Sequence, residues 1–196
     1  MLKKQIVIGV LLVLSLLIRS HAQVKKYGIK SGIVTFELAL KMGDMNMVSK
    51  SVVTFDDYGL KERKDTYSDD QLKETFFSDG KELYLVIYAE NTAYKRGPAY
   101  NGTEYKVSWE ELSRGGGKSL DAIKLANIEI LGKDCESYQI KSNNSTTVFA
   151  GWQGICLLMD TTTSGINSVL KAVKFEENVP ISSDMFKVPA GFATKS

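Results

Sequence analysis

The sequence predicts a mainly β fold of the α+β class, built as a long antiparallel meander that curls into an open half-barrel. Apolar and polar residues alternate along many short segments, and Gly, Asn and Asp separate these segments at intervals of about ten residues. This spacing favours hairpins over βαβ units. Because long strands twist, a long meander tends to curl toward a barrel.

The opening strand, expected over 29–41, has a clear alternation. Its apolar row is Val34, Phe36, Leu38 and Leu40. Glu37 falls between them, on the other face. Since successive strand residues point to opposite faces, we expect the apolar row to face the covered, concave side and Glu37 to face solvent.

The rest of the first half continues the meander. Strands are expected over 48–56, 60–67, 72–77 and 83–88. The turns between them contain Gly43, Gly59 and Gly80, which suit positive φ. The charged run 61–64 mixes bases with an acid, so 60–67 is expected to be solvated on at least one side. After Asn91 the pattern loosens, and 94–117 is expected to be loop with one short helix over 108–113.

The second half is expected to return to strands. A second helix would begin at Ser119, followed by a strand over 126–131. Three antiparallel strands then fill 132–160, with turns at 142–145 and 153–154. The last strand, 169–177, would carry Val169, Lys171, Val173 and Phe175 in one row. Residues 183–186 suit a turn of helix.

The first 22 residues are typical of a secretory signal peptide. Lys3 and Lys4 precede the apolar run 6–18, and Ser20-His21-Ala22 fits a cleavage site. A membrane span needs roughly 20 apolar residues, and Arg19 ends the run too early. No cysteine follows the site to accept a lipid. We therefore expect a periplasmic or secreted, not membrane-spanning, mature domain over 23–196.

Removing this leader changes the charge. The full chain has 25 basic and 23 acidic residues, and the leader holds three bases and no acid, which leaves the mature chain at −1. A nearly neutral domain lacks the basic footprint of a nucleic-acid-binding protein. The sequence gives no indication of the oligomeric state.

The mature chain lacks histidine, which many common active sites require. His21 is the sole histidine and leaves with the leader, which excludes His-based triads, His metal ligands and a His general base. The pairs Asp56-Asp57 and Asp69-Asp70 adjoin turns and lack a calcium-loop spacing. Residues 115–119 lack the first Gly of a phosphate-binding loop. We expect no enzyme activity, metal or cofactor.

Two sets of residues leave alternatives open. Cys135 and Cys156 could form a disulfide, as exported proteins often do. The meander instead places them on opposite sides of a middle strand, about 10 Å apart, whereas a disulfide needs Cα atoms within roughly 7 Å; they would then be buried thiols.

The Met-rich turn 42–47 could line an adaptable apolar mouth, although a hairpin that packs on its neighbour is the preferred interpretation.

Several short motifs resemble one family. They are Gly132-x-x-Cys135-x-x-Tyr138, Trp152-x-Gly154-Ile155-x-Leu157, Glu177-Asn178-Val179 and Phe186-x-Val188-Pro189-x-Gly191, with Gly32–Thr35 and Asp57-Tyr58-Gly59 compatible in the first half. They resemble exported bacterial proteins of unknown function that are similar in fold to the LolA/LolB lipoprotein carriers and receptors. The resemblance covers most of the mature chain. It implies an open half-barrel around one or two short helices, with an apolar concavity and no catalytic residue to transfer.

The sequence therefore favours a binding protein for lipid, a lipoprotein acyl chain or other apolar cargo. The expected lining residues are Val34, Phe36, Leu38, Val53, Phe55, Leu83, Leu85 and Ile87. The alternative is a cell-envelope structural or protein-interaction module whose concavity is filled by its own side chains. An enzyme is the least favoured of the three classes.

Overall fold

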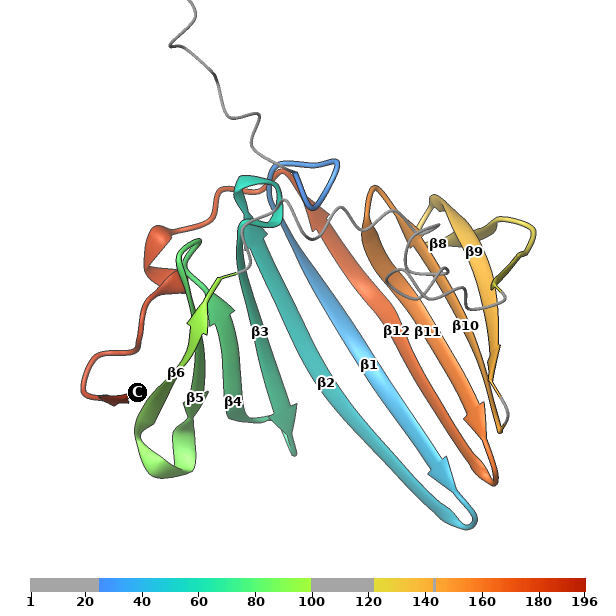
Figure 1. Ribbon diagram of the computed structural model, residues 1–196, viewed down its shortest axis with the longest axis horizontal. Helices are drawn as coiled ribbons and strands as arrows, with labels where there is room; N and C mark the ends of the chain where they lie inside the picture. The colour runs from blue at the N-terminus through green and yellow to red at the C-terminus, as the bar shows by residue number, and fades with distance from the viewer. Residues whose placement is uncertain (1–24, 100–121, 143) are drawn as a thin grey trace, which may run out of the picture.

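A computed structural model of the protein describes residues 25–99, 122–142 and 144–196, and its strands join into one long sheet (Figure 1). The first half contributes β1 (Gly32–Met42), β2 (Met45–Asp56), β3 (Lys61–Ser68), β4 (Gln71–Ser78), β5 (Glu82–Ile87) and β6 (Thr92–Pro98). The second half contributes β7 (Ala122–Lys124), β8 (Ile128–Ile130), β9 (Lys133–Ser142), β10 (Ser145–Trp152), β11 (Ile155–Thr163), β12 (Ile166–Glu177) and β13 (Ala193–Lys195).

The sheet consists of two meanders joined edge to edge. Its order is β13-β6-β5-β4-β3-β2-β1-β12-β11-β10-β9-β7, with β8 paired to β9. The β1–β12 pair joins the start of the domain to its end, and the sheet does not close into a barrel. The predicted mainly β, open, antiparallel architecture is confirmed, with one exception: the short β13 runs parallel to β6.

The helices of the described residues are three short 3-10 turns: η1 (Asp57–Gly59), η2 (Tyr88–Glu90) and η3 (Ser183–Phe186). The last is the predicted turn of helix. The helix expected over 108–113 lies outside the described residues. The helix expected from Ser119 is wrong where it can be checked, because 122–124 form β7, paired with β9.

The strands expected in the first half and in the 132–160 region are confirmed, but β6 was missed. Its Gly97 and Pro98 suggested a loop. Pro98 is the last residue of a strand near the sheet edge, where a missing N–H is tolerated. Residues 92–98 form a strand because their backbone pairs with β5.

The expected row along β12 is also wrong, because the strand contains a β-bulge. Val34 of β1 lies opposite Phe175, whereas Phe36, two residues further, lies opposite Ala172. Val173 is the residue that this register skips, and its side chain is 41% exposed. The bulge moves Phe175 to the face opposite to that of Val169 and Lys171.

The register defines two faces of the sheet, since residues directly opposed across a strand pair share a face. The Phe36 face, named for Phe36 of β1, carries the rung Val34, Val53, Lys64, Phe76, Leu85 and Tyr94. The Arg63 face, named for Arg63 of β3, carries the intervening residues, among them Asp65, Thr75 and Val86.

An N-terminal segment, 25–31, ties two turns together at one end of the sheet. The Tyr27 N–H donates to the Tyr58 carbonyl (3.0 Å), and the Gly28 N–H donates to the Gln153 carbonyl (2.8 Å). The Tyr27 ring packs edge-on against Phe55, with centroids 4.7 Å apart. Its hydroxyl donates to Glu62, and burial together with this carboxylate raises the pKa of Tyr27.

The C-terminal strap, 178–192, covers the Arg63 face of β3–β6 (Figure 1). Phe186 packs in a buried cluster with Phe77, Val86 and Ala93. The expectation that 60–67 is solvated on at least one side is confirmed for the Phe36 face, where Lys64 is exposed, whereas the strap covers the other side of this strand. Arg63 and Asp65 lie beneath the strap, with side chains only 12% and 8% exposed.

Candidate functional site

All eight predicted lining residues lie on the Phe36 face. Val34, Phe36 and Leu38 alternate along β1, and Val53 and Phe55 oppose Val34 and Gly32 from β2. The register continues through β3 and β4 to Leu83, Leu85 and Ile87 of β5. Period-two alternation therefore predicted their common face.

The structure divides these eight residues into two groups. Val34, Phe36 and Phe55 belong to the main buried cluster, at 0%, 6% and 0% exposure, with Val53 packed against them. Among the described residues, Leu38, Leu83, Leu85 and Ile87 lie outside this cluster and are half-buried. The first group is core, and the second forms part of an accessible surface.

Gly32 shows how tightly the buried group is packed. A Cβ at this position would come within 2.7 Å of the Phe55 ring and 3.0 Å of the Glu176 carbonyl oxygen. The Phe55 ring therefore occupies the space that a side chain on Gly32 would need. This end of the Phe36 face is filled by its own residues.

The far end of the same face is apolar and exposed. Met42, Met45, Met47 and Met159 are 45%, 52%, 55% and 40% exposed. Met42 and Met45 oppose each other, Met47 opposes Leu40, and Met159 opposes Leu170, which in turn opposes Leu38. The expected hairpin is present, and its strand β1 pairs with β12 as far as Met42, but the methionine side chains remain about half exposed.

Met42, Met45 and Met47 belong to the turn that the sequence offered as a possible apolar mouth. Met159 was missed, because a half-exposed Met and a buried Met give the same sequence pattern. Phe76, 44% exposed, was missed for the same reason. The alternation itself was readable: Met45 and Met47 continue the row of Val53 and Phe55. The apolar row therefore runs past the edge of the core onto the surface.

The Arg63 face is polar at the same level of the sheet. Lys50, Glu37 and Lys171 form one rung, and Asn46, Lys41 and Asn167 form another. The rung between them is the exception, since it consists of Val48, Ala39 and Val169, and Val48 is 73% exposed. The contrast makes this end of the sheet amphipathic, with its apolar side accessible, which is the surface expected of an interaction or ligand site.

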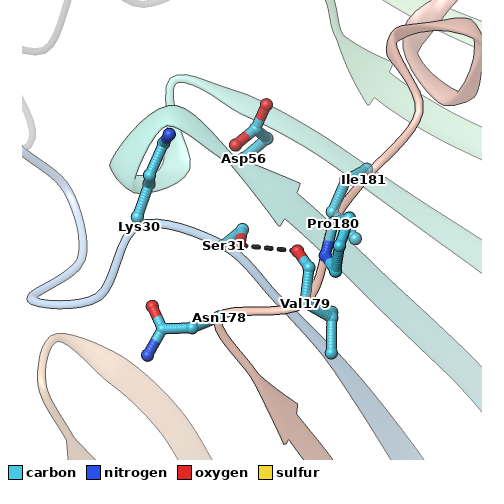
Figure 2. A pocket seen from close by; sticks show the side chains of 7 residues that line it. All are labelled: Lys30, Ser31, Asp56, Asn178, Val179, Pro180 and Ile181. Carbon is cyan, nitrogen blue, oxygen red and sulfur yellow. Dashed lines mark hydrogen bonds between the residues drawn. The ribbon is translucent and has the colours of Figure 1, made fainter.

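A separate small pocket lies between the N-terminal segment and the start of the strap (Figure 2). Its volume is about 330 Å³, and it is lined by Lys30, Ser31, Asp56, Asn178, Val179, Pro180 and Ile181. The Ser31 hydroxyl donates to the Val179 carbonyl at 2.7 Å. The pocket is open, its lining is part polar and part apolar, and the hydrogen bond from Ser31 holds the strap in place.

Neither cysteine is in a disulfide. Cys156 lies opposite Gly151, as the meander predicted, and its thiol donates to the Leu158 carbonyl at 3.2 Å. Burial raises the pKa of Cys156 to about 11 and also raises the pKa of Cys135. Both thiols are therefore protonated at neutral pH and poor nucleophiles.

Metal binding and membrane crossing are two further properties that the described residues bear on. Within 25–99, 122–142 and 144–196, no group of three or more His, Cys, Asp or Glu side chains is placed to hold a metal ion. Nor does any helix in those ranges have the length and apolar character to cross a membrane.

No protein-family model matches the chain, and no curated protein matches its sequence. Solved structures do match. An uncharacterized conserved protein from Thermus thermophilus superimposes with a TM-score of 0.58 at 10% identity, over 88% of this chain and 94% of that one. A chain of the Pseudomonas aeruginosa MucA/MucB complex matches with a TM-score of 0.51 at 10% identity, over 86% of this chain but only 59% of that one.

A LolA superfamily protein from Nitrosomonas europaea is also among the matches. Its TM-score is 0.42 at 9% identity, over 85% of this chain and 94% of that one. At these identities the likeness concerns the fold and not the function.

Proposed function

We propose that this protein is an exported, non-enzymatic binding protein that holds lipid, a lipoprotein acyl chain or similar apolar cargo on the Phe36 face. One observation carries the proposal: the apolar row of this face continues beyond the buried core onto exposed Met42, Met45, Met47 and Met159. Flexible, polarizable methionines suit a surface that adapts to apolar ligands. The resemblance of the sequence motifs to the LolA/LolB family supports the same proposal.

The exposed apolar side chains give the proposal a physical basis. Leaving them in water is unfavourable, and covering them with an acyl chain removes apolar surface of both partners from water. Each buried CH₂ contributes about 0.8 kcal/mol. Two additional methylenes in the cargo should therefore tighten binding by roughly an order of magnitude.

A titration with fatty acids of increasing chain length tests the proposal, using delipidated mature protein and calorimetry. We expect saturable binding that strengthens with chain length. Mass spectrometry of the protein as purified should detect co-purified lipid. A folded, delipidated sample that binds no fatty acid of any length would contradict the proposal.

Adjacent residues of β2 provide a matched pair of variants. Met47 lies on the Phe36 face and Val48 on the Arg63 face, and both are exposed, at 55% and 73%. Met47→Glu should weaken fatty-acid binding about tenfold, since a carboxylate would replace an apolar contact worth one to two methylenes. Val48→Glu should leave it unchanged. Equal effects would show that the cargo does not lie on this face.

A second candidate function rests on the filled part of the same face. The buried cluster around Val34, Phe36 and Phe55 leaves no room for cargo there. An envelope protein-interaction module would use the exposed methionines against a protein partner instead. In that case fatty acids would fail to bind, whereas Met47→Glu would abolish capture of the partner from cell-envelope extracts.

A further inference from the structure

The Phe36 face carries two charged side chains that form no hydrogen bond or ion pair with another described residue. The register places three charged residues on this face of β1–β5, namely Glu62, Lys64 and Glu74. Glu62 accepts from Lys26 at 2.6 Å and from the Tyr27 hydroxyl. Within the described part of the chain, the hydrogen bonds and ion pairs include neither the Lys64 nor the Glu74 side chain. Both residues are exposed.

Apolar side chains lie next to both of these residues. Lys64 lies between Val53 and Phe76 on its rung, and Glu74 lies between Thr66 and Ile87 on the next rung. Positions diagonal across neighbouring strands, such as Lys64 and Glu74, have Cα atoms about 7–8 Å apart. Two long side chains at that separation can hold a small charged group between their ends, next to an apolar surface that covers the rest of the ligand.

We propose that the Phe36 face selects an amphiphile with a zwitterionic headgroup, whose anionic phosphate is bound by Lys64 and whose ammonium is bound by Glu74. This inference rests on the proposed function, because the acyl part of the ligand occupies the apolar surface described above. The two charges sum to zero, which complements a headgroup that also carries one charge of each sign. Phosphoethanolamine is the simplest headgroup of this class.

Three short-chain lipids with identical acyl chains test the proposal in calorimetric titrations of the mature protein. The first is a phosphatidylethanolamine, with phosphate and ammonium; the second is a phosphatidylglycerol, with phosphate alone; the third is an uncharged diacylglycerol. We expect affinity to fall in that order, by about two- to fivefold at each step, as for exposed ion pairs.

Two variants assign the headgroup contacts. Glu74→Gln should reduce phosphatidylethanolamine binding to the level of phosphatidylglycerol. Lys64→Met should weaken both phospholipids and leave diacylglycerol unchanged. Lys171→Met and Glu37→Gln are the matched controls, because both residues are exposed and lie on the Arg63 face. Neither control should alter the preference among the three lipids.

Each contrary result has a distinct meaning. Equal affinity for all three lipids would overturn the headgroup proposal and leave apolar binding intact. A preference for phosphatidylglycerol that Glu74→Gln does not change would show selection of an anion only. Lower stability in both variants with an unchanged preference would show that Lys64 and Glu74 simply pair with each other. Failure of every lipid to bind would overturn the proposed function itself.

Discussion

Phe36 and Glu37 show how far a single residue's position follows from sequence. Their alternation predicted that Phe36 lies inside and Glu37 outside, and the structure gives Phe36 at 6% exposure and Glu37 exposed. Phe36 packs in the main cluster that also contains Val34 and Leu157. The predicted register of β1 is therefore confirmed, because a shift by one residue would reverse both side chains.

At the residue scale, we predict that Phe36→Ala lowers the free energy of unfolding by about 3–5 kcal/mol. The reason is the combined loss of apolar burial and creation of a cavity in a packed cluster. Glu37→Ala is the control and should change it by less than about 0.5 kcal/mol. Urea denaturation monitored by tryptophan fluorescence measures both. Equal losses for the two variants would contradict the register.

At the element scale, the C-terminal strap depends on a buried polar network under it. Arg63 donates from Nε to both carboxylate oxygens of Asp65 at 2.9 Å, and from Nη1 to the Met185 carbonyl at 3.1 Å. The Thr75 hydroxyl donates to Asp65 at 2.5 Å. Burial by itself lowers the pKa of Arg63, but the hydrogen bonds to the Asp65 carboxylate and its negative charge outweigh burial and raise that pKa. The network fixes the strap to β3.

We predict that Arg63→Met lowers the free energy of unfolding by about 3–5 kcal/mol, because it leaves the Asp65 carboxylate buried without its cation. The double variant Arg63→Met/Asp65→Leu should be more stable than Arg63→Met alone, since it removes that charge. Amide hydrogen exchange should also be faster at 185–186 in Arg63→Met. Lys73→Met, at an exposed position on β4, is the control. A double variant less stable than Arg63→Met would contradict the argument.

At the scale of the whole molecule, the two meanders meet where the chain's beginning and end come together. β1 pairs with β12, and the N-terminal segment spans the β2–β3 and β10–β11 turns. These contacts join residues that are far apart in sequence, so they form late relative to the local hairpins. The face that we propose for binding crosses this junction and depends on both halves.

The expected leader leads to a prediction at the same scale. We expect the exported protein to begin at Gln23, because the small residues before it form a cleavage site. A start there retains Tyr27, which packs against Phe55 and donates to Glu62. Intact mass and N-terminal sequencing of the protein from the periplasm or medium check this. A full-length mass, or a start beyond Tyr27, would contradict it.

The sequence by itself determined the mainly β class, most strand positions and the shared face of the eight residues that were expected to line a site. These follow from local rules: period-two alternation and turn residues act within a strand and its hairpin partner. Gly80 illustrates this, since its positive φ and the Asp79 carboxylate, which accepts from the Lys81 and Glu82 N–H groups, form the turn before β5.

Only the tertiary structure decided which parts of each face are buried. The β12 bulge, the strap over Arg63 and Asp65, and the exposure of Met42, Met45 and Met47 all depend on segments distant in sequence. An apolar residue gives the same periodic signal whether a distant segment covers it or leaves it in solvent. The β1–β12 pairing that joins the two meanders has no local signal either, because any strand edge of suitable length could form it.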